Sequence, residues 1–177
     1  KEFVQQFENL RTLNLAVTQT RRIMPDAFED CPQELTNIVI SGSRELVLPS
    51  VALFRNCTRL NQISINNCNL NTIPGELFQE LTSLRSLTLL SNNLTTLDAN
   101  LFNLLLNLVA LDIGFNPLRE LPEGLFRNLF QLQQLYIDFT NLNHLCGQDM
   151  MHCPLDISMN YYCGRFTKSR NIIIKKI

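Results

Sequence analysis

"SLTLLSNNLTTLDANLFNLLLNLVALDIGFNPLREL", residues 86–121, contains one pattern of residues twice. Asn92 is followed by leucines two and five residues later, and so is Asn116, 24 residues further along the chain. The pattern continues in both directions, with blocks that begin at Leu10, Leu35, Leu60, Leu84, Leu108 and Leu132. A fixed period within about 20–50 residues indicates a solenoid, in which each block forms one coil.

Each block opens with a short apolar alternation. Its first, fourth and sixth positions are apolar in all six blocks, as in Leu84, Leu87 and Leu89. This alternation predicts a short strand with one buried face. The second half of the first five blocks carries a phenylalanine, and the rings are Phe28, Phe54, Phe78, Phe102 and Phe126. Stacked in successive coils, they predict an aromatic column inside the outer, convex side.

The ninth position of each block holds a small polar residue or a cysteine. These residues are Thr18, Ser43, Cys68, Asn92, Asn116 and Thr140. An amide side chain there can bond backbone groups that a tight turn leaves unpaired. The position therefore predicts a ladder of side chains along the solenoid, with asparagine in only two coils.

The composition excludes several classes of protein. The chain has 177 residues, of which 45% are hydrophobic and 18% charged, so it can bury a core within one domain. Its formal net charge of -1 argues against nucleic acid as a partner. No apolar run approaches the roughly 20 residues that span a bilayer, so we expect no membrane span within this chain.

The two ends of the chain differ from the blocks. The chain begins with Lys1, and residues 1–9 look like the end of an earlier block, so we expect a processed protein or a fragment. Residues 164–177 carry five basic residues and no acidic one. We therefore divide the chain into a solenoid at 1–145, which starts within a repeat, and an irregular cysteine-containing segment with a basic tail at 146–177.

The segment "LVALDIGFNPLRELPEGLFRNLFQ", Leu108 to Gln131, resembles the typical 24-residue leucine-rich repeat, and the resemblance extends over residues 3 to about 145. It implies an α/β solenoid, a horseshoe with a parallel sheet on the concave side and irregular or short helical segments on the convex side. "IPGELFQELTSL" and "LPEGLFRNLFQL" are similar to repeats in the ectodomains of Toll-type receptors and related secreted invertebrate proteins. Two departures are the missing cysteine cap before the first repeat and the absence of tryptophan, which the usual C-terminal cap contains.

The six cysteines fall into two groups. Cys31 and Cys57 take a buried leucine position in adjacent blocks, and Cys68 takes the ladder position. We interpret these three as small buried thiols. The alternative is a disulfide bond between Cys31 and Cys57, which requires Cα atoms within about 7 Å.

The second group, Cys146, Cys153 and Cys163, follows the last block and is a candidate for a disulfide that covers the end of the solenoid. His144 and His152 lie in the same segment, but no C-x2-C pair is present, so we expect no metal. The sequence also contains no nucleophile elbow, phosphate loop or metalloprotease motif. We therefore expect neither catalytic residues, nor a cofactor, nor enzymatic activity.

Two sequons mark candidate sites of N-glycosylation. They are "NCT" at Asn56 and "NLT" at Asn93. Asn56 precedes the buried Cys57 on the convex side, and Asn93 follows Asn92 at a turn. Both positions should point outward, so the sequons and the extracellular type of repeat favour a cell-surface or secreted protein.

Residues at the fifth, seventh and eighth positions of each block should line the concave face, because the fourth and sixth face the core. The last two blocks place aromatic and acidic side chains there. These residues are Asp112, Phe115, Tyr136, Asp138 and Phe139. The earlier coils offer the more polar alternative of Asn66, Asn67, Thr88 and Leu90. The aromatic rings predict a protein interface, unless the C-terminal segment packs on them.

Two functions follow from the resemblance. The first is a ligand-binding ectodomain fragment of a Toll-like innate immune receptor, which binds a protein or microbial product on the concave face and can dimerise. The second is a self-contained secreted binding or scaffold protein of matrix or humoral immunity. An intracellular adaptor is a weaker third interpretation.

Overall fold

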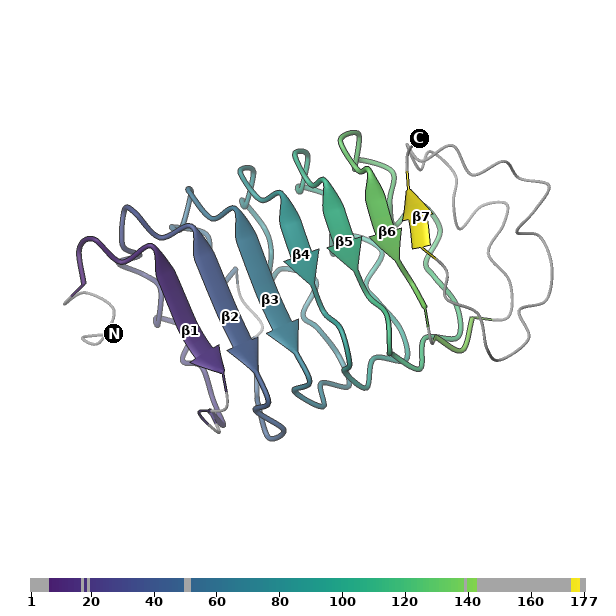
Figure 1. Ribbon diagram of the computed structural model, residues 1–177, viewed down its shortest axis with the longest axis horizontal. Coiled ribbons are helices and arrows are strands. Elements are labelled where there is room, and N and C mark those ends of the chain that lie inside the picture. Colours follow the sequence, from purple (N-terminus) through teal and green to yellow (C-terminus); the bar gives the residue numbers. More distant parts are fainter. Residues whose placement is uncertain are drawn as a thin grey trace.

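The computed structural model describes residues 7–16, 18, 20–49, 52–138, 140–142 and 173–175. Seven strands form one sheet in the order in which they occur along the chain (Figure 1). They are β1 (Thr12–Ala16), β2 (Asn37–Ser41), β3 (Gln62–Asn66), β4 (Ser86–Thr88), β5 (Ala110–Asp112), β6 (Gln134–Tyr136) and β7 (Ile173–Lys175). The predicted parallel solenoid is thus confirmed for β1–β6.

The register of the sheet follows the repeat. In each parallel pair a residue lies beside its counterpart one block later, as Leu87, Leu111 and Leu135 do in β4, β5 and β6. These central leucines are fully buried, whereas their neighbours in the same strands are half-buried. β7 differs because it pairs antiparallel with β6, with Leu135 opposite Ile174.

The core is one continuous cluster that runs through all six coils. The five phenylalanines of the predicted column are buried, and Phe54, Phe102 and Phe126 have no exposed surface. The rings of Phe28 and Phe54 have centroids 5.1 Å apart. Burial of a large aromatic side chain in each of these five coils adds to the hydrophobic stabilisation that a coil receives from its neighbours.

The segments that return from one strand to the next are irregular in the described residues. They consist of turns closed by hydrogen bonds from one backbone N–H to the carbonyl three residues earlier, such as Leu77 N to Pro74 O at 3.0 Å and Leu105 N to Phe102 O at 3.1 Å. The described residues contain strands and turns but no helix. No segment there is a helix of the length and apolarity that crossing a bilayer requires.

The ladder of asparagines joins adjacent coils. Asn92 Nδ2 donates to the carbonyl oxygens of Ile65 at 2.8 Å and Leu89 at 3.0 Å, and its Oδ1 accepts from the backbone N–H of Cys68 at 3.0 Å. Asn116 makes the corresponding bonds one coil later, to the Leu89 and Ile113 carbonyls. A buried amide therefore satisfies backbone groups of two coils at once.

The prediction that Cys31 and Cys57 are free thiols is wrong. They form a disulfide bond with Cα atoms 5.3 Å apart, between residues 26 positions apart in the sequence. Stacking places equivalent positions of adjacent coils close enough for this bond. Cys68 is a free, buried cysteine as predicted. Burial raises the pKa of its thiol, although backbone hydrogen bonds from Ser43 and Gly42 oppose the shift.

Candidate functional site

The sheet face opposite the aromatic column, called the open face below, changes in chemistry along the solenoid. The coils that contain β2–β4 present small or uncharged residues, among them Ser64, Asn66, Thr88 and Leu90. Ser64 is buried, Thr88 and Leu90 are half-buried, and Asn66 Oδ1 accepts a hydrogen bond from Leu90 N at 3.0 Å. These side chains thus partly serve the sheet itself, whereas the exposed Asn67 follows β3 at its edge.

Two carboxylates converge at Gly114, next to β5. The backbone N–H of Gly114 donates to Asp112 Oδ1 at 2.9 Å. A Cβ atom at Gly114 would lie 3.2 Å from that oxygen and 3.0 Å from Asp138 Oδ1. Glycine therefore leaves the space in which Asp112 and Asp138 approach each other. Burial raises the pKa of Asp112, the hydrogen bond from Gly114 lowers it, and the charge of Asp138 raises it further.

Phe115 lies beside these carboxylates in a left-handed backbone conformation. Its φ is 53°, and its side chain is 46% exposed. The equivalent positions of earlier coils are Gly42, Asn67 and Ser91, which also have positive φ. Small and amide residues adopt this conformation at lower cost than a bulky ring. Phe115 thus carries backbone strain without burying its ring in the core.

Tyr136 completes the described part of the predicted aromatic patch. It is half-buried in β6, and its hydroxyl oxygen lies 3.0 Å from Gln134 Oε1, to which the hydroxyl donates. β5 and β6 align Asp112 directly beside Tyr136. Phe139 lies outside the described residues. The structure therefore brings together Asp112, Phe115, Tyr136 and Asp138, four of the five residues predicted for this patch.

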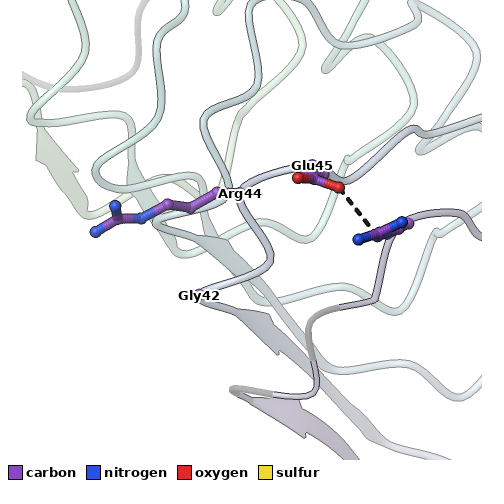
Figure 2. Close-up of a pocket in the computed structure, with 4 residues that line it drawn as sticks. Gly42, Arg44 and Glu45 are labelled. Carbon is purple, nitrogen blue, oxygen red and sulfur yellow. Dashed lines mark ion pairs between the residues drawn. The ribbon is translucent and has the colours of Figure 1, made fainter.

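A second polar region lies at the edge of the sheet where β2–β4 end. A hollow of about 310 Å³ is lined by Arg21, Gly42, Arg44 and Glu45. Arg21 Nε lies 3.0 Å from Glu45 Oε2, and Figure 2 shows Arg44 extending away from this ion pair. Arg44 also lines the neighbouring hollow of about 370 Å³, whose other lining residues are Asn67, Asn69, Ser91, Asn92 and Asn93.

This region at the ends of the strands was not predicted, because strand alternation indicates only which residues lie on each face of the sheet. A signal was present, since the residues after β2–β4 are rich in Gly, Asn and Ser, which favour turns with positive φ.

Both sequon asparagines are exposed, as predicted, and Asn93 lies in this region. Cys146, Cys153 and Cys163 lie outside the described residues. Elsewhere, in the part that the structure describes, no group of three or more metal-ligating side chains occurs.

Comparison with known proteins agrees with the coil architecture. The structure is similar to TLR13 in its complex with ssRNA13, with a TM-score of 0.66, 24% identity, and coverage of 72% of this chain and 18% of the other. A leucine-rich repeat protein of Leptospira interrogans has a TM-score of 0.66 and 22% identity over 81% of this chain and 35% of that protein. The chain in the Drosophila Toll–Spatzle complex has a TM-score of 0.62 and 23% identity, with coverage of 81% and 22%.

At these identities the likeness shows the fold alone, and the chain spans about a fifth to a third of the length of these structures. Among curated proteins none matches. The family model for the BspA type leucine rich repeat region matches in six copies, over residues 3–103 and 50–157. The match indicates no catalytic family. It covers most of the sequence, and the chain therefore belongs to the BspA-type leucine-rich repeat family.

Proposed function

We propose that the chain is a non-enzymatic recognition module of an extracellular protein, and that it binds a protein or microbial product on the open face at β5 and β6. The observation that carries the proposal is Phe115, a half-exposed ring in a strained left-handed conformation. Strain at an exposed position lowers stability, and such strain clusters at binding sites. Exposed aromatic side chains are enriched among residues that dominate binding energy.

Charge supports a partner with basic groups. Asp112 and Asp138 converge over Gly114 beside Phe115, while Tyr136 lies next to Asp112. A lysine or arginine of the partner can pair with the carboxylates while its stem packs on the rings. The same carboxylates repel phosphate groups, which argues against nucleic acid as the ligand here.

Placement in a Toll-like innate immune receptor is the more specific part of the proposal. Similarity in fold to TLR13 and to a chain of the Toll–Spatzle complex supports it. The disulfide bond between Cys31 and Cys57 supports an oxidising, extracellular setting, because thiols stay reduced in the cytosol. Glycans on Asn56 and Asn93, dimerisation, and a cap at 146–177 bearing the candidate disulfide cysteines belong to the same proposal. The second candidate, a self-contained secreted protein, is favoured by the same disulfide.

The test uses the secreted chain and two matched substitutions. Phe115→Asn removes the ring and keeps a residue that tolerates positive φ. Phe130→Asn removes a ring that is 62% exposed in the loop before β6, at the opposite end of the strands. Binding is measured to a panel of purified extracellular proteins and microbial cell-wall preparations. We expect Phe115→Asn to weaken binding by about 1–3 kcal/mol at unchanged or higher melting temperature.

Phe130→Asn should leave the affinity within a factor of about two, because it lies away from the proposed surface. Loss of binding with Phe130→Asn and retention with Phe115→Asn would contradict the proposal. A large fall in melting temperature with Phe115→Asn would instead place the ring in the packing of the C-terminal segment.

A further inference from the structure

The side-chain amide of each sequon asparagine donates one hydrogen bond to the preceding coil. Asn93 Nδ2 donates to Asn71 Oδ1 at 2.6 Å, and Asn56 Nδ2 donates to the Glu29 carbonyl oxygen at 2.6 Å. A primary amide nitrogen carries two hydrogens. One hydrogen is therefore left on each nitrogen for replacement by a sugar, while the other keeps the side chain in a defined direction.

The two asparagines differ in their surroundings. Asn93 shares its hollow of about 370 Å³ only with polar residues. Asn56 lines a hollow of about 260 Å³. Its other lining residues are the charged Asp26, Glu29 and Arg55 and, in contrast to the hollow at Asn93, the apolar Pro25, Phe28, Ala52 and Leu53. Sugar hydroxyl and N-acetyl groups hydrogen-bond well with amide, hydroxyl and guanidinium groups, so the surroundings of Asn93 are chemically the better match.

The polar groups around Asn93 are unused. Within the described part of the chain, the side chains of Arg44, Asn67, Asn69 and Ser91 make no hydrogen bond or ion pair. Asn92 is different, because its amide already bonds backbone groups of two coils. It therefore lines the hollow without offering a free hydrogen-bonding group. Four unpartnered polar side chains around one hollow form a hydrogen-bonding surface of the size of a small polar ligand.

We propose that this hollow seats the first N-acetylhexosamine of a glycan attached to Asn93. The inference rests on the extracellular setting of the proposed function. In the transfer, Asn93 Nδ2 loses one hydrogen as a proton and forms a bond to C1 of the sugar, and the bond from C1 to the diphosphate of a lipid-linked oligosaccharide donor breaks. The lipid diphosphate leaves with the electron pair of that bond.

A seated sugar would cover the edge of the coils that contain β2–β4. The open face at β5 and β6 lies further along the sheet, so a sugar seated toward Arg44 and Asn67 would leave it accessible. The glycan would therefore add polar surface. It would also leave the aromatic and acidic end of the solenoid as the accessible part of the sheet.

The experiment compares glycosylated and unglycosylated protein in two backgrounds. The full chain is secreted from eukaryotic cells, glycan occupancy at Asn93 is determined by peptide mass mapping, and an endoglycosidase trims the glycan to one N-acetylhexosamine. Thr95→Ala supplies the protein without this sugar. The second background carries Arg44→Ala, Asn67→Gly and Asn69→Gly, because glycine preserves the positive φ of both asparagines.

We expect the single sugar to raise the melting temperature by about 2–4 °C in the native background and by less than about 1 °C in the triple variant. Hydrogen exchange of residues 67–71 should slow about threefold only in the former. The sugar at Asn56, removed by Thr58→Ala, is the control, and its effect should be the same in both backgrounds.

An equal effect of the Asn93 sugar in both backgrounds would overturn the proposal, because the sugar would then extend into solvent. An unmodified Asn93 in secreted protein with an intact disulfide bond would also overturn it. Either result leaves the proposed recognition by the open face standing, since that role is tested separately by the binding of Phe115→Asn and Phe130→Asn. An unmodified Asn93 would remove only the glycan at this residue from the proposed function.

Discussion

The two halves of the solenoid join their coils by different means. In the first half, β1–β3, a disulfide bond connects two coils, and the ladder positions hold Thr18, Ser43 and Cys68. Thr18 Oγ1 bonds the Leu15 carbonyl of its own coil, and in the described residues the buried Ser43 Oγ has no hydrogen-bond partner. In the second half, β4–β6, Asn92 and Asn116 bond backbone groups of adjacent coils.

This difference shows that the contact between adjacent coils can be secured in more than one way. A solenoid is stabilised by a sum of contacts between neighbours, so a covalent bond in one contact can offset weak hydrogen bonding there. The second half uses amides, and it also carries the strained Phe115. Asn116 directly follows this residue and bonds the Gly114 carbonyl at 3.1 Å, so the ladder holds the backbone around the strain.

The aromatic column should be equally important in both halves. Replacing Phe102 with alanine should lower the free energy of unfolding by about 3–5 kcal/mol, because the ring is fully buried and leaves a cavity. Phe54→Ala, also at a fully buried ring, should cost a similar amount in denaturant unfolding. A cost for Phe54 below half that for Phe102 would show that the first half depends on its disulfide bond more than on the column.

The disulfide bond should stabilise the first half more than the second. Replacing Cys31 and Cys57 with alanine should lower the free energy of unfolding by about 2–4 kcal/mol, because the bond restricts the unfolded chain. Native-state hydrogen exchange should accelerate mainly in β1 and β2. Equal acceleration in β5 and β6 would contradict the separation of the two halves.

The ladder can be tested with one substitution in each half. Asn116→Ala should lower the free energy of unfolding by about 2–3 kcal/mol, because buried carbonyls and the N–H of Leu94 lose their partner. Ser43→Ala should change it by less than about 0.5 kcal/mol, since the hydroxyl makes no bond. A marked loss of stability with Ser43→Ala would indicate a bonded water molecule at this position.

The smallest expected effect is the pH dependence at Asp112. Burial raises its folded pKa above the ordinary value of 3.8. The contribution of this group to stability is therefore fully present below the unfolded pKa and is lost as pH rises through the folded pKa. Asp112→Asn should give a slightly higher melting temperature at pH 7, and the difference should disappear at pH values below the unfolded pKa. If Asp112→Asn were less stable than the native protein at pH 7, the charged form of Asp112 would be net stabilising, which would contradict this prediction.

Much of the fold was predictable because the repeat states it several times. Each apolar position recurs one coil later, so the buried faces of β4, β5 and β6, the five buried rings and the amide ladder could be derived from spacing. The preference for free thiols at Cys31 and Cys57 was wrong because it was based on residue type. Whether two cysteines bond depends on the distance between stacked coils, and a linear sequence does not contain that distance.

The sequence by itself determined the coil period, the buried residues, the exposed sequons and the residues of the open face, because side-chain direction follows directly from strand alternation. Only the tertiary structure decided three features. These are the disulfide bond, the approach of Asp112 and Asp138 over Gly114, and the polar hollow around Asn93. Each arises where residues about one coil apart, or further, meet, so each depends on how the coils stack and on the backbone conformation of the turns between them.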